Sequence, residues 1–93
     1  MKKIIVLSIA MMLSGMMMAQ NAKDFLRMGD EHLANKDWNK AIESFSYCIK
    51  LQPDYQTLYK AHYGRGFAYF NLTEYKLART DFDRSIRIFP NDP

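Results

Sequence analysis

Apolar side chains recur at three- and four-residue steps along most of the chain, which is the spacing that gives a helix one apolar face. A first helix carries Phe25, Met28 and Leu33 on this face and ends at the polar residues 35–37. A second helix follows over residues 38–51. No stretch alternates apolar and polar residues with period two, so the pattern predicts an all-α fold.

Two further helices are predicted, one over residues 54–71 and one that ends before Pro90. Side chains that accept hydrogen bonds from a first helical turn stand before three of the four segments. The predicted caps are Asn21, Asp37 and Thr73. Pro53 ends the second helix, because the residue before a proline disfavours the helical conformation.

The second half of the chain repeats the first at an offset of 37 residues. Four landmarks coincide at this offset: Gly29 with Gly66, Ala41 with Ala78, Phe45 with Phe82, and Pro53 with Pro90. A glycine inside a helix costs about 1 kcal/mol relative to alanine, so we expect each glycine to admit a close neighbouring helix. The alanines are expected opposite the glycines, with the phenylalanines beside the contact. The spacing thus predicts two antiparallel helix pairs packed side by side.

This duplicated pattern resembles the tetratricopeptide repeat family over about residues 22–90. The matching landmarks of the first copy are Phe25, Met28, Gly29, Trp38, Ala41, Phe45 and Pro53, and those of the second are Gly66, Tyr69, Leu72, Tyr75, Ala78, Phe82 and Pro90. The departures are His32, Cys48, His62, Ser85 and three extra residues near positions 54–58. The resemblance implies a short right-handed solenoid of helix-turn-helix pairs within a domain of residues 20–93, with repeats at about 22–55 and 59–92.

Members of this family generally bind proteins or peptides in a concave groove that is lined by the first helix of each pair. The resemblance therefore implies a partner-binding groove with these residues: Lys23, Leu26, Arg27, Asp30, Lys60, Tyr63, Phe67, Phe70 and Asn71. Aromatic rings with a few cations suit a peptide that has apolar anchors and an acidic group. An alternative stays open, in which Phe67 and Phe70 pack internally and only cover the helix pairs.

The reactive side chains do not form a recognisable catalytic set, and the family carries no chemistry of its own. Cys48 lies on an apolar helix face, where a buried inert thiol is expected. His32 and His62 are 30 residues apart and lack metal-ligand spacing. Asp81 and Asp83 point to different sides of a helix. We therefore predict a protein that is not an enzyme and holds neither a cofactor nor a metal.

Charge and cysteine content narrow the possible partners further. The chain has 13 basic and 10 acidic side chains, and two of the basic ones, Lys2 and Lys3, stand at its start. The remaining charge is close to neutral, so nucleic-acid binding is not expected. One cysteine excludes an internal disulfide.

Residues 1–19 have the order of an export signal, with two lysines followed by an uncharged apolar run over residues 4–19. Cleavage after Ala19 would release an exported protein, periplasmic or secreted, into the bacterial envelope, with no membrane contact after signal removal. The alternative is an uncleaved membrane anchor. Sixteen helical residues rise only about 24 Å, less than the roughly 30 Å of a bilayer core.

The last helix is expected to leave Leu77, Ile86 and Phe89 partly uncovered, because a solenoid repeat buries its apolar face against a neighbour. The first functional hypothesis is an exported module that binds a partner protein or peptide. The second is a structural protein that self-associates through its C-terminal helix. A third hypothesis makes the chain the N-terminal fragment of a larger envelope protein.

Overall fold

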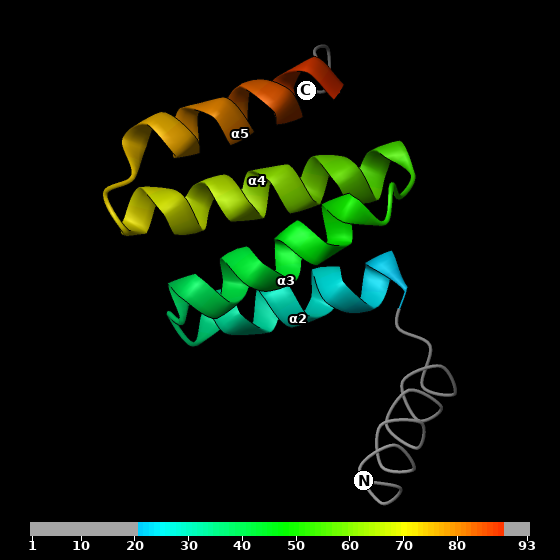
Figure 1. The fold of residues 1–93 in the computed structure, drawn as a ribbon, viewed down its shortest axis with the longest axis horizontal. Coiled ribbons are helices and arrows are strands. Elements are labelled where there is room, and N and C mark those ends of the chain that lie inside the picture. The colour runs from blue at the N-terminus through cyan, green and yellow to red at the C-terminus, as the bar shows by residue number, and fades with distance from the viewer. Residues whose placement is uncertain (1–20, 89–93) are drawn as a thin grey trace, which may run out of the picture.

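The computed structural model describes residues 21–88, which form four α-helices in two antiparallel pairs (Figure 1). Helices α2 (Ala22–Ala34) and α3 (Trp38–Lys50) make the first pair, and α4 (Tyr55–Asn71) and α5 (Tyr75–Ile88) make the second. The predicted all-α fold is confirmed. Helix α4 packs against α2, α3 and α5, whereas α5 contacts α4 alone among the described helices. The helix α4 is therefore the element that joins the two pairs.

Side-chain caps fix where two of the helices begin. The Asn21 side-chain oxygen accepts a hydrogen bond from the Asp24 backbone N–H at 2.9 Å, and the Asp24 carboxylate accepts one from the Asn21 N–H at 3.2 Å. This reciprocal capping box confirms Asn21 as the cap of α2. At α4 the Asp54 carboxylate accepts from the Thr57 N–H at 2.8 Å. Asp37 precedes α3 as predicted, but its side chain makes no capping hydrogen bond.

The turns inside the two pairs have the same backbone shape. Lys36 and Thr73, at equivalent positions, both adopt the left-handed conformation, with φ of 58° and 61°. The prediction that Thr73 caps the last helix is wrong, because α5 begins two residues later at Tyr75. The Thr73 hydroxyl instead donates a hydrogen bond to the Leu72 carbonyl at 2.6 Å. The residue belongs to the turn and reverses the chain.

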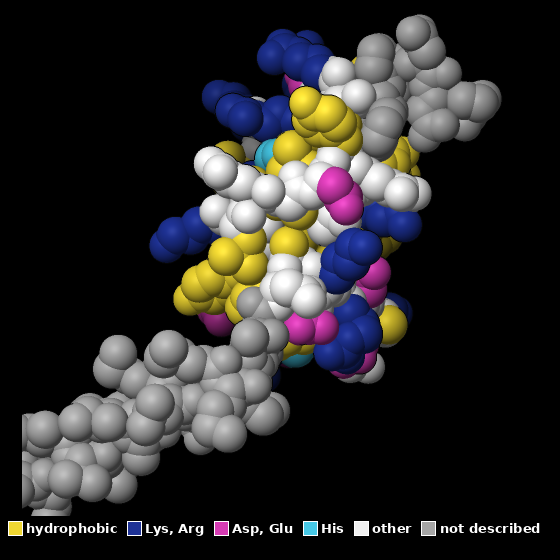
Figure 2. Space-filling view, turned by 90° about the vertical axis from the view of Figure 1, so that its right-hand side faces the viewer, with side chains coloured by type: hydrophobic (Ala, Val, Ile, Leu, Met, Phe, Trp, Pro, Cys, Tyr) yellow, Lys and Arg dark blue, Asp and Glu magenta, His cyan; other side chains and the backbone are white. Residues whose placement is uncertain are grey.

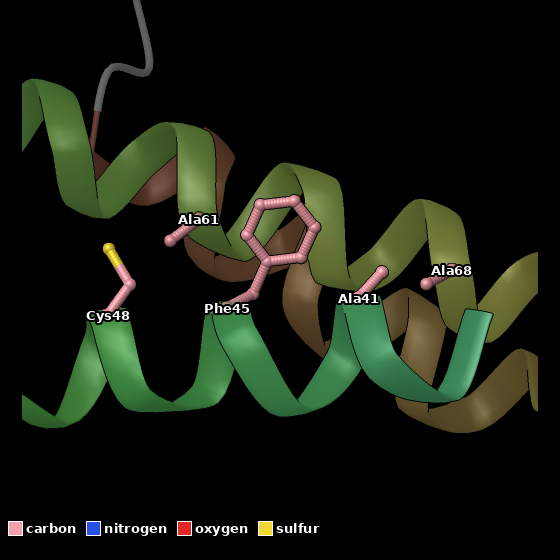
Figure 3. Close-up of a cluster of buried hydrophobic side chains, with 5 residues drawn as sticks. All are labelled: Ala41, Phe45, Cys48, Ala61 and Ala68. Atoms are coloured by element: carbon pink, nitrogen blue, oxygen red, sulfur yellow. The ribbon is translucent and has the colours of Figure 1, made fainter. Parts of the chain in front are cut away.

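The core lies between α3 and α4, where the Phe45 ring is completely buried (Figure 3). Two glycines, one on α2 and one on α4, leave room for this ring. The nearest atoms to a side chain at Gly29 of α2 would belong to Phe45, and a Cβ on Gly64 of α4 would lie 2.5 Å from its Cζ. Gly29 therefore makes its closest contacts with the Phe45 ring, and not with an alanine as the sequence predicted. Gly66 faces both the Phe82 ring and the Ala78 carbonyl.

Candidate functional site

A groove of about 400 Å³ runs between α2 and α4, the first helices of the two pairs. Its lining residues are Asp30, Leu33, Tyr59, Lys60, Tyr63, Gly64 and Phe67. Because α2 and α4 lie side by side, both helices contribute walls, and neither pair alone would form this groove.

Aromatic rings make the α4 wall and remain accessible. Tyr63 is 54% exposed and Phe67 is 44% exposed, although both belong to a packed helix. The Phe67 ring meets Trp38 of α3 edge-on, with 6.1 Å between ring centroids. The Tyr63 ring lies 5.6 Å from Phe82 and 6.3 Å from Tyr59. These contacts hold the rings in place while leaving area free to bury against a partner.

One charge of each sign faces the groove, Asp30 from α2 and Lys60 from α4. Partial burial raises the pKa of the Asp30 carboxyl above its ordinary value of 3.8, and the nearby positive charge of Lys60 opposes this rise. A carboxylate that has lost part of its hydration benefits from a cationic neighbour. The groove thus combines apolar walls with two polar handles of opposite charge.

Four of the residues predicted for the groove line it, namely Asp30, Lys60, Tyr63 and Phe67. Both phenylalanines of the alternative hypothesis, Phe67 and Phe70, are about half exposed rather than enclosed. That these residues bind a partner stays a prediction.

The other five predicted residues lie outside this groove. Leu26 packs against the core, and the Arg27 guanidinium pairs with Glu31 on the same helix. Phe70 lies edge-on to Tyr75, with ring centroids 5.4 Å apart. The remaining two are Asn71, whose side-chain amide donates to the Phe67 carbonyl, and Lys23, which lines a separate hollow near Pro53. Their assignment to the groove came from the resemblance to the family, whereas in the fold the neighbouring side chains decide their contacts.

A buried ionic network between α4 and α5 was not predicted. The Asp81 carboxylate accepts hydrogen bonds from Arg65 Nε and Nη2, both at 2.8 Å, and lies 2.9 Å from His62 Nδ1. Arg65 Nη1 also donates to the Ser46 hydroxyl of α3 at 3.1 Å. Asp81 and His62 are 2% and 5% exposed. The network therefore ties three helices together away from solvent.

The charge state of this network follows from its partners. Burial raises the pKa of Asp81, but the hydrogen bonds and positive charges of His62 and Arg65 outweigh it, so the net pKa lies below the ordinary 3.8. The hydrogen bond to Asp81 also raises the pKa of Arg65. Asp81 is thus an anion held by the Arg65 guanidinium, with the His62 ring nitrogen at hydrogen-bond distance. A sequence signal existed, because His62 and Arg65 stand three residues apart where a helix shows one face.

Residues 21–88 show neither a reactive thiol nor a cluster of metal ligands. Burial raises the pKa of the Cys48 thiol from 9.0 to about 11, which disfavours the reactive thiolate. No three potential metal ligands gather in this part of the chain. None of its helices is long and apolar enough to cross a membrane.

Comparison with known proteins finds a family match that begins within α4 and includes α5. Residues 59–92 match the family model described as tetratricopeptide repeat. The chain is also similar to nuclear autoantigenic sperm protein of Homo sapiens, at 29% identity over 75 residues, which is 75% of this chain and 10% of that protein. The proteins of the same name from Oryctolagus cuniculus and Bos taurus are each 29% identical over 72 residues, 72% of this chain and 10% and 9% of theirs. No solved structure matches. The chain thus spans about a tenth of the length of these relatives.

These relatives correct the predicted location. Export to a bacterial envelope, as a periplasmic, secreted or membrane-anchored protein, is contradicted, because the similar proteins are mammalian and are named as nuclear. The prediction depended on the apolar run over residues 4–19, which lies outside the described residues. An apolar run after two lysines is a pattern of composition, and composition alone does not specify a compartment.

Proposed function

Because the chain belongs to the tetratricopeptide repeat family, we propose that it is a protein-interaction module whose partner binds in the groove between α2 and α4. The observation that carries this proposal is the groove itself, an apolar hollow with half-exposed rings at Tyr63 and Phe67. Exposed aromatic area of this kind is what partner binding buries. Residues 22–55 and 59–92 act as two repeats of one binding unit, since each supplies one wall.

The groove favours a peptide segment with one apolar anchor and a flanking acidic group. The anchor side chain lies between Leu33 of α2 and the aromatic rings of α4, where it is shielded from water on both sides. Lys60 is exposed at the rim and attracts the acidic group. Asp30 does not attract a charged group of the peptide, because its carboxyl already lies near the positive charge of Lys60. The anchor provides most of the affinity and the charge sets the orientation.

The proposal is tested by selecting peptides from a random displayed library on the immobilised chain and measuring the affinity of the enriched peptides by fluorescence anisotropy. The double variant Lys60→Ala, Phe67→Ala removes one handle and one ring of the groove. We expect it to bind the selected peptides about tenfold or more weakly. The enriched peptides are expected to share an apolar residue near an acidic one.

A matched control pair changes the same residue classes away from the groove. Lys50→Ala, Tyr55→Ala alters a lysine at the end of α3 and a tyrosine of α4 that is 74% exposed. This variant should retain full affinity. If both double variants bind equally well, or if the library yields no enriched peptide, the groove is not the binding site.

A further inference from the structure

The internal duplication provides a template for a second binding surface, separate from the groove. In the first pair, seven apolar side chains are partly buried against the core cluster to which α4 contributes Ala61 and Ala68, and for four of them the equivalent residue of the second pair is apolar or aromatic and exposed. At the offset of 37, these four pairs are Leu26 with Tyr63, Leu33 with Phe70, Trp38 with Tyr75, and Ile49 with Ile86. The counterparts are between 52% and 59% exposed. We call Tyr63, Phe70, Tyr75, Ile86 and the half-buried Phe82 the open face.

The way α4 covers the first pair shows what fits on such a face. Helix α4 turns Ala61, Gly64 and Ala68 toward the core, and all three are buried. Their spacing of three and four residues places them on one helix face. A Cβ on Gly64 would lie 2.5 Å from Phe45 Cζ, so the missing side chain is what lets the helix approach this ring. A helix with small residues at the same spacing can approach Phe82 in the same way.

A second copy of this chain cannot extend the stack head to tail. The helix that would dock is α2, and its counterparts of Ala61, Gly64 and Ala68 are Asp24, Arg27 and Glu31. Arg27 and Glu31 are well exposed, and they form an ion pair of 2.8 Å on the outside of α2. Arg27 would have to lie against Phe82, where the template requires a glycine. The outer face of α2 is therefore a polar end of the stack.

Charge also opposes a dimer in which two open faces meet. The exposed charges of α5 are Lys76, Arg79, Arg84 and Arg87, against a single exposed acid, Asp83, which lies 4.0 Å from Arg79. Arg79 is the counterpart of Ile42, which packs against the core in the first pair, so this charge belongs to the region that a partner covers. Figure 2 shows basic side chains at the α5 end, whereas both signs alternate toward α2 and α3. Two such faces would repel each other, but an acidic helix would be attracted.

We propose that the open face binds a helix of another protein that presents small residues at positions i, i+3 and i+7 and acidic residues on its flanks. The small residues lie over Phe82 and bury the exposed rings and Ile86. The acidic flanks pair with Lys76 and Arg79 of α5, whereas Arg84 and Arg87 line a separate hollow with Leu58 and His62. This surface is distinct from the groove, with Tyr63 at the border of both.

The test uses the full chain and a synthetic fluorescent peptide of about 20 residues, long enough to be helical when lactam-stapled. The peptide carries Ala, Gly and Ala at i, i+3 and i+7 and glutamates on the flanks. One matched peptide has leucine in place of the glycine, and another has lysines in place of the glutamates. We expect the first to bind, and both matched peptides to bind about tenfold or more weakly.

Two protein variants locate the site. Ile86→Glu places a like charge on the open face and is expected to weaken binding of the glutamate peptide about tenfold or more. Leu77→Glu is the matched control. Leu77 is 47% exposed, but its counterpart in the first pair is Lys40, which is exposed and does not pack against the core cluster. It should bind within about twofold of the wild type. Thermal melting monitored by circular dichroism verifies that both variants are folded.

Four results would overturn the proposal. The first is no binding of the glutamate peptide, and the second is equal binding by the Ile86→Glu variant. The third is loss of binding in the Lys60→Ala, Phe67→Ala variant with Ile86→Glu unaffected, which would move the peptide to the groove. The fourth is a wild-type dimer that Ile86→Glu converts to a monomer, since a second copy would then occupy the open face.

Discussion

The two helix pairs share one backbone plan but differ in what fills it. Four inward positions carry Phe25, Met28, Ser44 and Cys48 in the first pair and His62, Arg65, Asp81 and Ser85 in the second. The first set surrounds an apolar core, whereas the second contains a buried ionic network that is fully hydrogen-bonded. The pairing therefore depends on glycine meeting phenylalanine, which both pairs retain, and less on the polarity of the remaining positions.

Coverage is the other difference between the pairs. Phe45 is fully buried and lies against two glycines, Gly29 of α2 and Gly64 of α4. Phe82 has Gly66 on one side, and over residues 21–88 no second glycine approaches it. The same residue type thus serves as a core side chain in one pair and as part of an open face in the other.

The largest expected effect separates these two phenylalanines. Phe45→Ala should lower the free energy of unfolding by about 4 kcal/mol, because it leaves a cavity in a fully enclosed site. Phe82→Ala should cost about 2 kcal/mol, since part of that ring already faces solvent. Urea unfolding followed by circular dichroism measures both. Equal losses would mean that coverage by α4 does not distinguish the pairs.

The ionic network gives the next largest effect. Asp81→Ala should cost about 3 kcal/mol, because Arg65 and His62 are left without their anion. The triple variant His62→Phe, Arg65→Met, Asp81→Ser introduces the residues of the first pair at equivalent positions. It should regain stability to within about 1 kcal/mol of the wild type, since apolar packing can replace a buried ion network. A triple variant as unstable as Asp81→Ala would show that the two fillings are not interchangeable.

Acid should weaken the second pair selectively. The pKa of Asp81 is lower in the folded chain than the ordinary 3.8, so its contribution is complete above pH 3.8 and is lost as the pH falls below that value. The triple variant lacks this carboxylate. Between pH 4 and pH 2 we expect the unfolding free energy of the wild type to fall more than that of the triple variant. A constant difference across this range would contradict the assignment.

Replacing glycine by alanine should have a smaller effect, and it should again be larger beside the enclosed Phe45 than beside the partly buried Phe82. Gly64→Ala is expected to cost about 2 kcal/mol, because the enclosed Phe45 ring has no free space into which to move. Gly66→Ala should cost about 1 kcal/mol, since the partly buried Phe82 ring can move and alanine favours the helix, while the new methyl also lies 3.2 Å from the Ala78 carbonyl. Melting temperatures of the two single variants provide the comparison. A larger loss for Gly66→Ala would reverse the proposed role of coverage.

The smallest effect concerns the two equivalent turns. Both Lys36 and Thr73 have positive φ, where glycine is not strained. Thr73→Gly should raise the unfolding free energy by about 1 kcal/mol, because a β-branched residue is the more strained in this conformation. Lys36→Gly should raise it by about half as much. A loss of stability in Thr73→Gly would mean that its hydroxyl bond to Leu72 outweighs the strain.

Local patterns predicted most of the fold. The three- and four-residue spacing identified the helices, and Asn21 was identified as a cap because its hydrogen bond reaches only three residues along the chain. Thr73 was misassigned, because sequence alone does not distinguish a capping residue from the left-handed turn residue just before it. In the groove, Tyr63 and Phe67 were assigned from the resemblance to the family and line it, whereas the side-chain amide of Asn71 donates to a carbonyl of its own helix.

By itself the sequence determined the helices, their pairing and the duplication, because periodicity, caps and repeated landmarks act over short stretches of chain. Only the tertiary structure decided that Gly64 encloses Phe45 and that Asp81 is buried against His62, 19 residues away. Those contacts depend on how α4 is placed between α2 and α5. A contact between distant residues is set by the packing of whole helices, which local spacing does not specify.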